Sequence, residues 1–434
     1  MFIKKLVKKL LPKGIFYKIE PYGHLVEAFL VNLINGFPGR NIKVIGVTGT
    51  NGKTTTSFMI YKMLQTAGYK TGLMTTVAWG AGDDIKSQIH HYTNVPSREL
   101  MKRLKYMKDQ KVDWLVLETT SQALAQHRVF GIKYSIAVFT NLTHEHLDYH
   151  RTFERYRDAK RRMFKSANKN KNGLRTGIIN ADDNNASFFA KDVIHPLLYG
   201  INNGEIKALN IKQTARGSSY LAKIKDKTYN IQCALPGSFN IYNSLAVVGV
   251  GYILGLNVKQ VEQGIASLKS VEGRMNYVNE GQDFDVVIDY AHSPDSFEKI
   301  FKDIKPLVKN QLIVVFGSAG RRDEAKRAIQ GELAGKYADQ VILTEEDDRD
   351  VDGRSILEDI AKGAIKAGKT KNKDLFLILD RPEAIHFATQ RAKPGDMVMF
   401  LGKGHEKTIE RANGENPWDE AKEVRQALKT IKKS

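Results

Sequence analysis

The stretch VTGTNGKTTT, residues 47–56, gathers glycine, lysine and threonine at one point of the chain. β-Branched residues before it read as a strand that ends at Thr48, and the residues from Lys53 on read as a helix. Glycines let backbone N–H groups approach phosphates, the helix N-terminus adds positive charge, and a lysine and a threonine hydroxyl can serve the phosphates and Mg²⁺. The predicted triphosphate-binding residues are Gly49, Thr50, Asn51, Gly52, Lys53, Thr54 and Thr55.

The spacing departs from the standard phosphate loop, G-x-x-x-x-G-K-[ST], because Val47 stands where the first glycine belongs. The alternative interpretation is a strand-to-helix turn with an incidental lysine. A strand before the loop and a helix after it are the context that phosphate binding requires, and they favour the first interpretation.

Three further groups have side chains suited to chemistry. Glu118 ends the apolar run DWLVLE, where an open α/β sheet presents its ligand crevice, although it could also be a capping carboxylate. The histidines of THEHLDYH could form a structural zinc site, but Cys233 is the single cysteine of the chain, which disfavours that interpretation. Asn240 and Asn243 lie three residues apart on a predicted helix, and their amides can satisfy an adenine edge.

The elements that position these residues alternate from about residue 41, as in a doubly wound α/β domain. IKVIGVT, DWLVLE, YSIAVFT and TGIIN read as buried parallel strands. A polar, β-prone stretch near 205–235 suggests an antiparallel excursion, and a helix follows it. A second alternating series runs from FDVVIDY to DMVMFLG. We expect an α/β fold with a P-loop central domain over 41–271 and a smaller Rossmann-like C-terminal domain over 272–434.

Composition narrows the partners and the compartment. The net charge of +19 favours polyanions, anionic lipid headgroups or phosphorylated substrates. A single cysteine suits a reducing compartment, so we expect a cytoplasmic location. No run approaches the roughly 20 apolar residues of a membrane span. Residues 1–40 form a short basic segment, in which residues 1–12 are amphipathic and either pack on the body or contact an anionic membrane surface.

Further stretches match the sequence motifs of one known family, and they occur in the same order along the chain. They are ETTSQALAQHRV, FTNLTHEHLDYH, YRDAKRRMF, GSFNIYNSLAV, EGRM, DYAHSPDS, FGSAGRRDEAKR and GKGHE. Together with the phosphate loop they resemble the Mur ligase family, and within it the MurE type, from about residue 41 to about residue 410. The resemblance implies an ATP-dependent amide-bond ligase, in which a substrate carboxylate becomes an acyl phosphate and an amine then displaces phosphate.

The resemblance also implies roles around the metal. It assigns Glu118 and His146 to Mg²⁺, with Thr54 from the loop, and Glu145 matches the acidic residue beside the histidine. Lys160, in YRDAKRRMF, matches a lysine that is carbamylated in the family and helps to bind the metal. From the residues alone, a lysine on a basic helix would be read as solvent-exposed. Asp148 and His150 are expected to be structural partners.

Beyond the loop, the resemblance implies five nucleotide-binding residues in the second half of the chain: Asn240, Asn243, Arg274, Asp289 and His292. Substrate contacts follow from three partly altered motifs. HYTNVPSREL departs from the family's Thr-Thr-Pro stretch at Asn94 and Val95, and Gln122 replaces a histidine in TSQALAQHR. The Asp-Asn-Pro-Arg motif appears as EDDR, residues 346–349. The implied substrate residues are Thr93, Thr120, Ser121, Arg128, Arg349, Gly402 and Glu406.

Arg349 and Glu406 favour meso-diaminopimelate as the added amino acid, since a guanidinium pairs with a carboxylate and a carboxylate receives an ammonium. L-Lysine stays open. The family normally carries about a hundred residues that hold UDP before the loop, whereas 46 residues precede Val47 here. The muramoyl-peptide acceptor is therefore either UDP-linked with reduced uridine recognition or lipid-linked. We expect a monomer that binds no nucleic acid.

Three other functions compete with this interpretation. A folylpolyglutamate synthase shares the phosphate loop and metal site, but TTSQALAQHRV and GKGHE disfavour it. A nucleic-acid-dependent P-loop ATPase would use the positive charge for phosphate contacts, yet no nucleic-acid-binding module is recognisable. A non-catalytic binding module is disfavoured because Lys53, Glu118, His146 and Lys160 are all present.

Overall fold

The structure is a computed structural model that describes residues 13–88 and 93–431. The amphipathic segment at residues 1–12 and the side chain of Asp148 lie outside what it describes. The chain forms two compact units. The first comprises Met1–Ile211, Tyr220–Ile231 and Tyr242–Ser267, and the second comprises Lys212–Ser219, Gln232–Ile241 and Leu268–Ser434. The domain limits predicted above stay predictions beside these bounds.

The first unit is built on an 11-stranded sheet whose middle strands are parallel and buried. β1 (Lys43–Thr48) pairs with β5 (Trp114–Glu118) and β6 (Tyr134–Phe139). These strands are apolar along nearly their whole length because helices cover both of their faces. The order is β11-β10-β9-β8-β7-β6-β1-β5-β2-β3-β4. The other strands are β2 Thr71–Met74, β3 Ala78–Ala81, β4 Asp84–Ser87, β7 Thr176–Asn180, β8 His195–Gly200, β9 Ile206–Thr214, β10 Gly217–Ile224 and β11 Lys227–Cys233.

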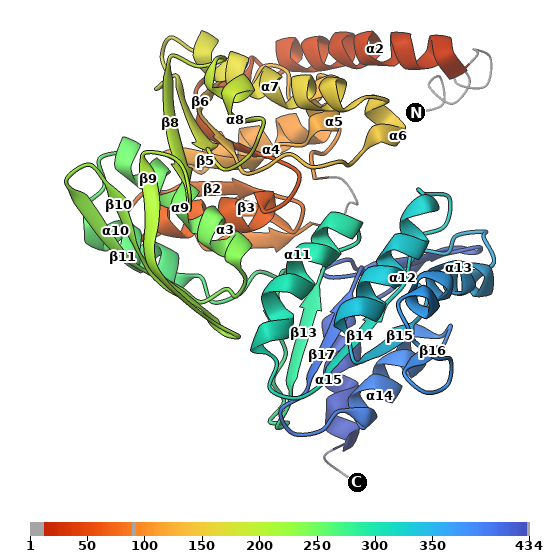
Figure 1. Ribbon diagram of the computed structural model, residues 1–434. Helices are drawn as coiled ribbons and strands as arrows, with labels where there is room; N and C mark the ends of the chain where they lie inside the picture. The colour runs from red at the N-terminus through yellow and green to blue at the C-terminus, as the bar shows by residue number, and fades with distance from the viewer. Residues whose placement is uncertain (1–12, 89–92, 432–434) are drawn as a thin grey trace. The chain divides into compact units, whose positions relative to one another are not determined.

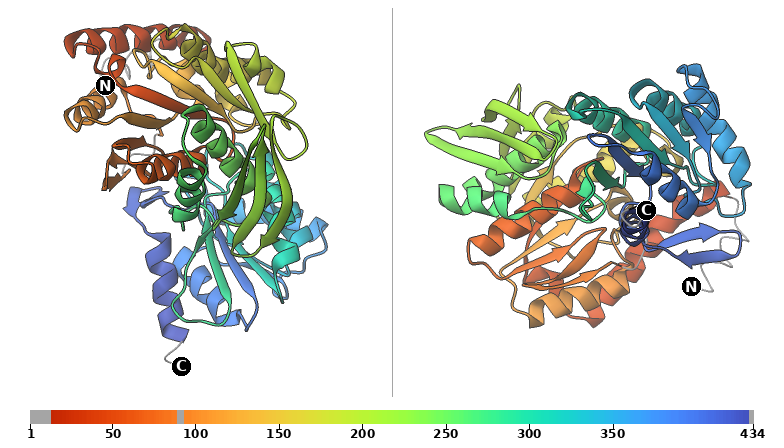
Figure 2. Two further views of the ribbon diagram at one scale, coloured as in Figure 1. Left: turned by 90° about the vertical axis from the view of Figure 1, so that its left-hand side faces the viewer. Right: turned by 90° about the horizontal axis from the view of Figure 1, so that it is seen from below.

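Figure 2 shows β9, β10 and β11 as long strands at one edge of this sheet, where the sequence suggested an antiparallel excursion. Helices α4, α5, α7 and α8 share one apolar core, while α3 packs on β1, β2 and β5 and against α10. The helices are α2 Lys13–Ile34, α3 Lys53–Thr66, α4 Ser97–Asp109, α5 Ser121–Ala125, α6 Leu147–His150, α7 Phe153–Lys169, α8 Ala186–Ala190, α9 Ser238–Ile253 and α10 Val258–Ser267, with a 3-10 turn at Pro38–Arg40. The start of α9, as far as Ile241, belongs to the second unit.

Helix α7 places a lysine inside the first unit. Thr152 caps the helix by accepting a hydrogen bond from the Arg155 N–H, as N-cap threonines do. Its buried positions recur every three or four residues, so they lie on one face. Lys160 belongs to that face and is 1% exposed. The buried face is Tyr156, Ala159, Lys160, Met163, Phe164 and Ala167.

The second unit is a six-stranded sheet in the order β12-β13-β17-β14-β15-β16. All its neighbours are parallel except β12 and β13, and apolar cores lie on both faces. Its strands are β12 Asn276–Tyr277, β13 Asp285–Asp289, β14 Leu312–Phe316, β15 Gln340–Leu343, β16 Leu375–Leu377 and β17 Met397–Leu401, with a hairpin of β18 Thr408–Arg411 and β19 Gly414–Pro417. Its helices are α11 Pro294–Ile304, α12 Ala325–Tyr337, α13 Gly353–Lys366, α14 Arg381–Arg391 and α15 Glu420–Ile431, with a 3-10 turn at Lys305–Leu307.

Figure 1 shows the strands of both units, and candidate residues lie at the carboxyl ends of parallel strands in each unit, which is where open α/β sheets bind ligands. In the first unit the phosphate-loop stretch follows β1, and Glu118 ends β5. In the second, Asp289 ends β13, and GKGHE follows β17. The predicted α/β class is confirmed. Within the described residues, no helix combines the length and the apolar character needed to cross a bilayer.

Candidate functional site

The turn between β1 and α3 is fastened to the residues that follow β6. The Thr50 N–H donates to the Asn141 carbonyl at 2.8 Å, and the Asn51 N–H donates to Asn141 Oδ1 at 2.9 Å. In return, Thr140 Oγ1 donates to the Asn51 carbonyl at 2.6 Å. These hydrogen bonds hold the turn in one conformation, so a ligand that binds it incurs a smaller conformational-entropy cost.

Two glycines of this turn have no room for a side chain. A Cβ on Gly49 would overlap Thr140 Oγ1, and one on Gly52 would overlap Asn243 Oδ1. Gly52 also has φ of +80°, a conformation that glycine adopts without strain. Asn243 Oδ1 accepts from Thr56 Oγ1 at 3.1 Å. The structure thus places the predicted nucleotide residue Asn243 against the turn itself.

Two lysines direct their amines at the carbonyls of the turn. Lys53 Nζ donates to the Thr50 carbonyl at 2.6 Å, and Lys160 Nζ donates to the Gly49 carbonyl at 2.7 Å. Burial, and after it the charge of Lys53, lowers the pKa of Lys160 well below its usual value. Lys160 is therefore deprotonated more easily than a surface lysine, and the neutral amine is its nucleophilic form.

Glu118 joins three segments of the first unit. Its Oε2 accepts from Thr54 Oγ1 at 2.9 Å and from the Thr76 N–H at 3.0 Å. Thr76 Oγ1 donates to Glu118 Oε1 at 3.0 Å and lies 2.8 Å from Thr93 Oγ1. Thr76 was not among the residues predicted from the sequence. Its signal was available, because Thr76 lies just beyond the carboxyl end of β2, which is paired with β5.

The donors here suit Mg²⁺, which prefers carboxylate and hydroxyl oxygens and keeps several waters or phosphate oxygens as ligands. Thr54 and Glu118 supply such oxygens in direct contact. Among the described residues, no three or more His, Cys, Asp or Glu side chains group closely enough to hold a metal by themselves. A metal at Glu118 would therefore take the rest of its coordination from other oxygens, as Mg²⁺ does with a nucleotide.

His146 is linked to the turn indirectly, because its ring packs near Tyr156, whose hydroxyl contacts Thr50. Its ring centroid lies 6.1 Å from that of Tyr156, whose hydroxyl is 3.0 Å from Thr50 Oγ1. His146 Nε2 also lies 3.9 Å from Glu145 Oε2. Glu145 and Glu118 both act electrostatically on Lys160. The structure thus brings the predicted metal and catalytic residues of the first unit to the phosphate-loop end of the sheet.

Asn94, which interrupts the expected motif, positions two predicted substrate residues. Its Nδ2 donates to the Glu118 carbonyl at 2.8 Å, and its Oδ1 accepts from the Thr120 N–H at 2.9 Å and from Thr120 Oγ1 at 3.0 Å. Arg128 Nη1 donates to the Asn94 carbonyl. Asn94 is 2% exposed. Asn94 was not predicted to belong to the site, because its burial and its contacts with Glu118 and Thr120 are visible only in the structure.

Ser121 and His150 pair with each other, Ser121 Oγ lying 3.0 Å from His150 Nε2. Asn240 belongs to the second unit, and its Nδ2 donates to the Pro236 carbonyl at 2.7 Å. The predicted residues therefore divide between the two units, with Asn243 in the first. Their nucleotide and substrate roles stay predictions.

The remaining predicted nucleotide residues lie around the end of β13 in the second unit. Asp289 Oδ2 accepts from the Met275 N–H at 2.7 Å, and burial raises the pKa of this carboxyl. The Arg274 guanidinium lies 4.6 Å from the centre of the Tyr290 ring. His292 Nδ1 is 2.8 Å from the Tyr290 carbonyl. Arg274 and His292 are thus both held by Tyr290, a residue that the sequence analysis did not assign.

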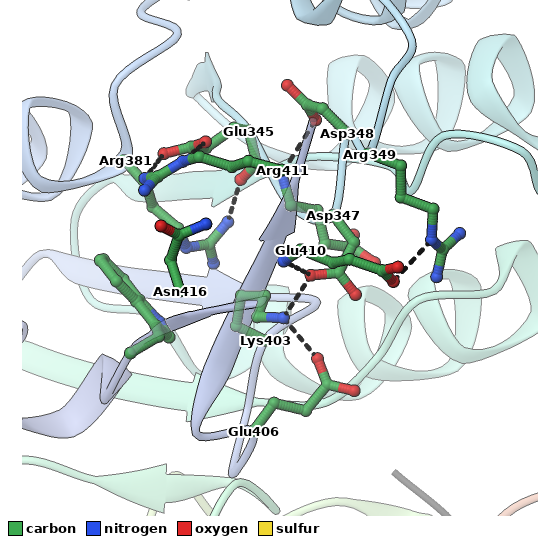
Figure 3. Close-up of polar contacts among 12 residues, drawn as sticks. Glu345, Asp347, Asp348, Arg349, Arg381, Lys403, Glu406, Glu410, Arg411 and Asn416 are labelled. Atoms are coloured by element: carbon green, nitrogen blue, oxygen red, sulfur yellow. Dashed lines mark hydrogen bonds and ion pairs between the residues drawn. The ribbon is translucent and has the colours of Figure 1, made fainter. Parts of the chain in front are cut away.

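Lys403 is the centre of a polar network in the second unit (Figure 3). Its buried Nζ donates to Asp347 Oδ1 at 2.8 Å and to Glu406 Oε2 at 2.6 Å. The Tyr290 hydroxyl donates to Glu406 Oε1 at 3.2 Å. Glu406, predicted to receive the distal ammonium of the amino acid, thus already accepts from one ammonium of its own chain.

Arg349 is joined to the same network through the β18–β19 hairpin. Arg349 Nε donates to Glu410 Oε2 at 2.7 Å, and the Glu410 N–H donates to Asp347 Oδ1 at 3.0 Å. Arg349 also donates to the Gly320 carbonyl. Arg349, predicted to bind a carboxylate of the amino acid, therefore has a carboxylate partner from its own unit, and a substrate carboxylate would compete with Glu410.

Glu346 adds a buried carboxylate to this group. Within the described residues its Oε2 has no hydrogen-bond partner, and burial raises the pKa of the carboxyl. Gly402, with φ of +100°, gives it room, because a Cβ there would lie 2.7 Å from Glu346 Oε2. The hydrogen-bonded network has three carboxylates (residues 347, 406 and 410) and two cations (residues 349 and 403), and the Glu346 carboxyl interacts electrostatically with Lys326 and Lys403. Such a set attracts a positively charged group.

Two family models match the chain. The model described as "Mur ligase middle domain" matches residues 47–251, and the model described as "Mur ligase, glutamate ligase domain" matches residues 273–404. The first match begins at the phosphate loop, and the second ends within GKGHE.

Curated relatives extend the likeness to most of the chain. A UDP-N-acetylmuramyl-tripeptide synthetase from Roseiflexus sp. (strain RS-1) is 37% identical over 420 residues, which cover 94% of this chain and 82% of that protein. A UDP-N-acetylmuramoyl-L-alanyl-D-glutamate–2,6-diaminopimelate ligase from Clostridium acetobutylicum is 37% identical over 404 residues, with 92% and 80% covered. The tripeptide synthetase of Borreliella burgdorferi is 36% identical over 433 residues, with 98% and 84% covered.

Solved structures share the architecture. A UDP-N-acetylmuramoyl-L-alanyl-D-glutamate–2,6-diaminopimelate ligase superposes with a TM-score of 0.64 at 30% identity, covering 90% of this chain and 79% of that one. A Mycobacterium tuberculosis folylpolyglutamate synthase, solved with ADP and AMPPCP, gives a TM-score of 0.69 at 16% identity, with 94% and 95% covered. At 16% identity the second likeness shows the fold alone.

Proposed function

The chain belongs to the Mur ligase family, and from that membership we propose that it is an ATP-dependent ligase of the muramoyl-tripeptide synthetase type. It joins an amino acid, with meso-diaminopimelate favoured and L-lysine as the alternative, to a UDP-N-acetylmuramoyl-dipeptide acceptor. The observation that carries the proposal is the meeting of Lys53, Thr54, Glu118 and Lys160 around one phosphate-binding turn.

The turn binds the triphosphate. Gly49 and Gly52 allow close approach of the backbone, and α3 directs its positive end at the anion. Lys53 offsets the charge that gathers as the γ-phosphoryl group moves to the acceptor carboxylate. An oxygen of that carboxylate forms the new bond to phosphorus while ADP leaves. The amino nitrogen then attacks the carboxyl carbon, loses a proton, and expels phosphate.

Bound Mg²⁺ would neutralise phosphate charge and order the reacting oxygens. Thr54 and Glu118 would hold it, with His146 as a further ligand. Thr76 keeps the Glu118 carboxylate in place through two hydrogen bonds, so the carboxylate is oriented before a metal binds.

Lys160 is proposed to act as its carbamate. A neutral lysine amine attacks carbon dioxide, the new C–N bond forms, and one proton leaves, so the neutral side chain becomes a carbamate with one negative charge. From the ammonium form, two protons leave in all. Its burial and lowered pKa support this, because the reacting form is the neutral amine. Glu145 and Glu118 would repel a further anion, and Mg²⁺ held by Thr54 and Glu118 would offset that repulsion.

The second unit is proposed to select the amino acid. Glu346, with an unpartnered buried oxygen, and Glu406 would receive its distal ammonium. A distal carboxylate would pair with Arg349 in place of Glu410, and a guanidinium binds carboxylates in two parallel hydrogen bonds. This division of roles fits meso-diaminopimelate, which carries both groups, while L-lysine would use the carboxylates alone. The monomeric state and cytoplasmic location stay predictions.

The experiment is phosphate release from ATP by the purified chain with UDP-N-acetylmuramoyl-dipeptide and a panel of amino acids, followed by mass analysis of the product. Release that requires both acceptor and amino acid, with a product heavier by one residue, supports the proposal. Release that needs neither would contradict it. Lys62→Ala is a matched control for Lys53→Ala, since Lys62 lies on the same helix and contacts Gln65 rather than the turn.

A further inference from the structure

Helix α2 carries an apolar stripe that the described part of the chain leaves exposed. Tyr22, Val26, Phe29, Leu30 and Leu33 are 69%, 58%, 46%, 49% and 57% exposed. They recur every three or four residues and so lie on one side of the helix. With Ile34 they make six of the thirteen exposed large apolar side chains among the described residues. These exposed side chains are therefore concentrated on one helix, the 22-residue α2.

The other side of α2 attaches the helix to the first unit. Ala28 and Asn32 are buried, and Asn32 Nδ2 donates to the Phe130 carbonyl at 3.0 Å. Val31 packs on the apolar core of that unit. Figures 1 and 2 show α2 along the outer edge of the unit. A helix that is apolar on its outer side as well as its inner side normally has a partner there.

The sequence next to the stripe indicates what this partner is. The first 19 residues carry six lysines and no acidic residue, and Glu20 is the first carboxylate of the chain. Glu27, the acidic side chain between Val26 and Phe29, lies 3.7 Å from Arg98, which offsets its charge. Positive charge followed directly by an exposed apolar face is the composition that binds anionic bilayers, because lysines meet the headgroups while apolar side chains enter the boundary below them.

We propose that the α2 stripe, Tyr22, Val26, Phe29, Leu30 and Leu33, rests on the surface of an anionic lipid bilayer, and that the preceding lysines contribute the electrostatic part of the binding. Binding strength at a bilayer surface increases with the apolar area that is buried and with the electrostatic attraction to anionic lipids, so the two contributions reinforce each other. The proposal concerns a surface contact and does not depend on the ligase activity. It places the first unit at a membrane whose headgroups are negatively charged.

The test is co-sedimentation of the full chain with vesicles made of equal parts phosphatidylcholine and phosphatidylglycerol, and with vesicles of phosphatidylcholine alone. The test variant combines Phe29→Ser, Leu30→Ser and Leu33→Ser. The matched control is Ile194→Ser, since Ile194 is 49% exposed but lies outside α2. Thermal unfolding of each variant checks that the fold is retained, and nucleotide binding gives a second check at the phosphate-binding turn.

The expected result is sedimentation with the phosphatidylglycerol vesicles only, a loss of at least roughly tenfold in partition coefficient for the triple variant, equivalent to about 1.4 kcal/mol, and no change for Ile194→Ser. Three results would overturn the proposal. They are no sedimentation of the wild-type chain, equal sedimentation of the triple variant, and a dimer by light scattering that the triple variant converts to a monomer. The last would assign the stripe to a second copy of the chain.

Discussion

Replacing Lys160 by alanine is expected to slow ligation by two to three powers of ten. Lys160 is 1% exposed, and its Nζ lies 2.7 Å from the Gly49 carbonyl, so its charged or carboxylated group acts where water screens little. Removing one preorganised polar group beside developing charge costs about 2.7–4 kcal/mol, which is roughly 10²–10³ in rate. The assay is phosphate release at saturating ATP, acceptor and amino acid, with and without added formate or acetate.

A carbamate at Lys160 predicts that formate or acetate restores part of the lost rate, because a small carboxylate can enter the space left by the side chain. Lys165→Ala is the matched control, since Lys165 lies on the same helix with an exposed side chain and should leave the rate unchanged. An unaltered rate in Lys160→Ala would refute a catalytic role. A lost rate that no carboxylate restores, with thermal unfolding unchanged, would refute the carbamate.

Three further predictions test other parts of the site. Glu118→Gln is expected to weaken apparent Mg²⁺ affinity at least roughly tenfold, and an unchanged Mg²⁺ titration of the rate would exclude this carboxylate as a ligand. Glu410→Ala removes the carboxylate that competes with substrate for Arg349. Since exposed ion pairs are worth up to about 1 kcal/mol, KM for meso-diaminopimelate should fall by up to about fivefold while KM for L-lysine stays constant. Equal changes in the two KM values would contradict the role of Arg349. Burial, then the charge of Arg274, lowers the pKa of His405 from 6.5 to about 3. Between these values the unfolded chain binds a proton that the folded chain does not, so stability decreases as the pH is lowered from 6.5 toward 3, by about 3 kcal/mol at about pH 4.5. His405→Gln should lose less stability than wild type in urea unfolding at that pH, and an identical loss would contradict the argument.

The fold and the phosphate-binding turn were predictable because their signals are local. Each parallel strand is a continuous apolar run, and Gly52 and Lys53 between a strand and a helix indicate the turn. The burial of Lys160 was also predictable from residue spacing alone. Position 160 lies four residues after Tyr156 and three before Met163, and so falls on the apolar face of α7. Its composition, rich in lysine and arginine, suggested a solvent-exposed face instead, and the spacing was the better guide.

Contacts between distant segments were not predictable in the same way. Asn94 contacts the carbonyl of Glu118, and Glu410 reaches Arg349 from a hairpin some sixty positions along the chain. Nothing in the local sequence of either residue reports its partner, because such contacts are set by how strands and loops pack. The effect is largest in the second unit, where Arg349 and Glu406, predicted to contact substrate, also have partners within the protein.

The central claim is that ATP bound at the Lys53 turn activates the acceptor by transferring its γ-phosphoryl group to a carboxylate oxygen. The direct measurement uses an acceptor whose reacting carboxylate carries a heavy oxygen isotope, in the presence of ATP and meso-diaminopimelate. If the claim is correct, the released phosphate contains one labelled oxygen from the acceptor and the amide retains the other. Unlabelled phosphate, released at the same rate as product, would show that the carboxylate never bonded to phosphorus and would contradict the account.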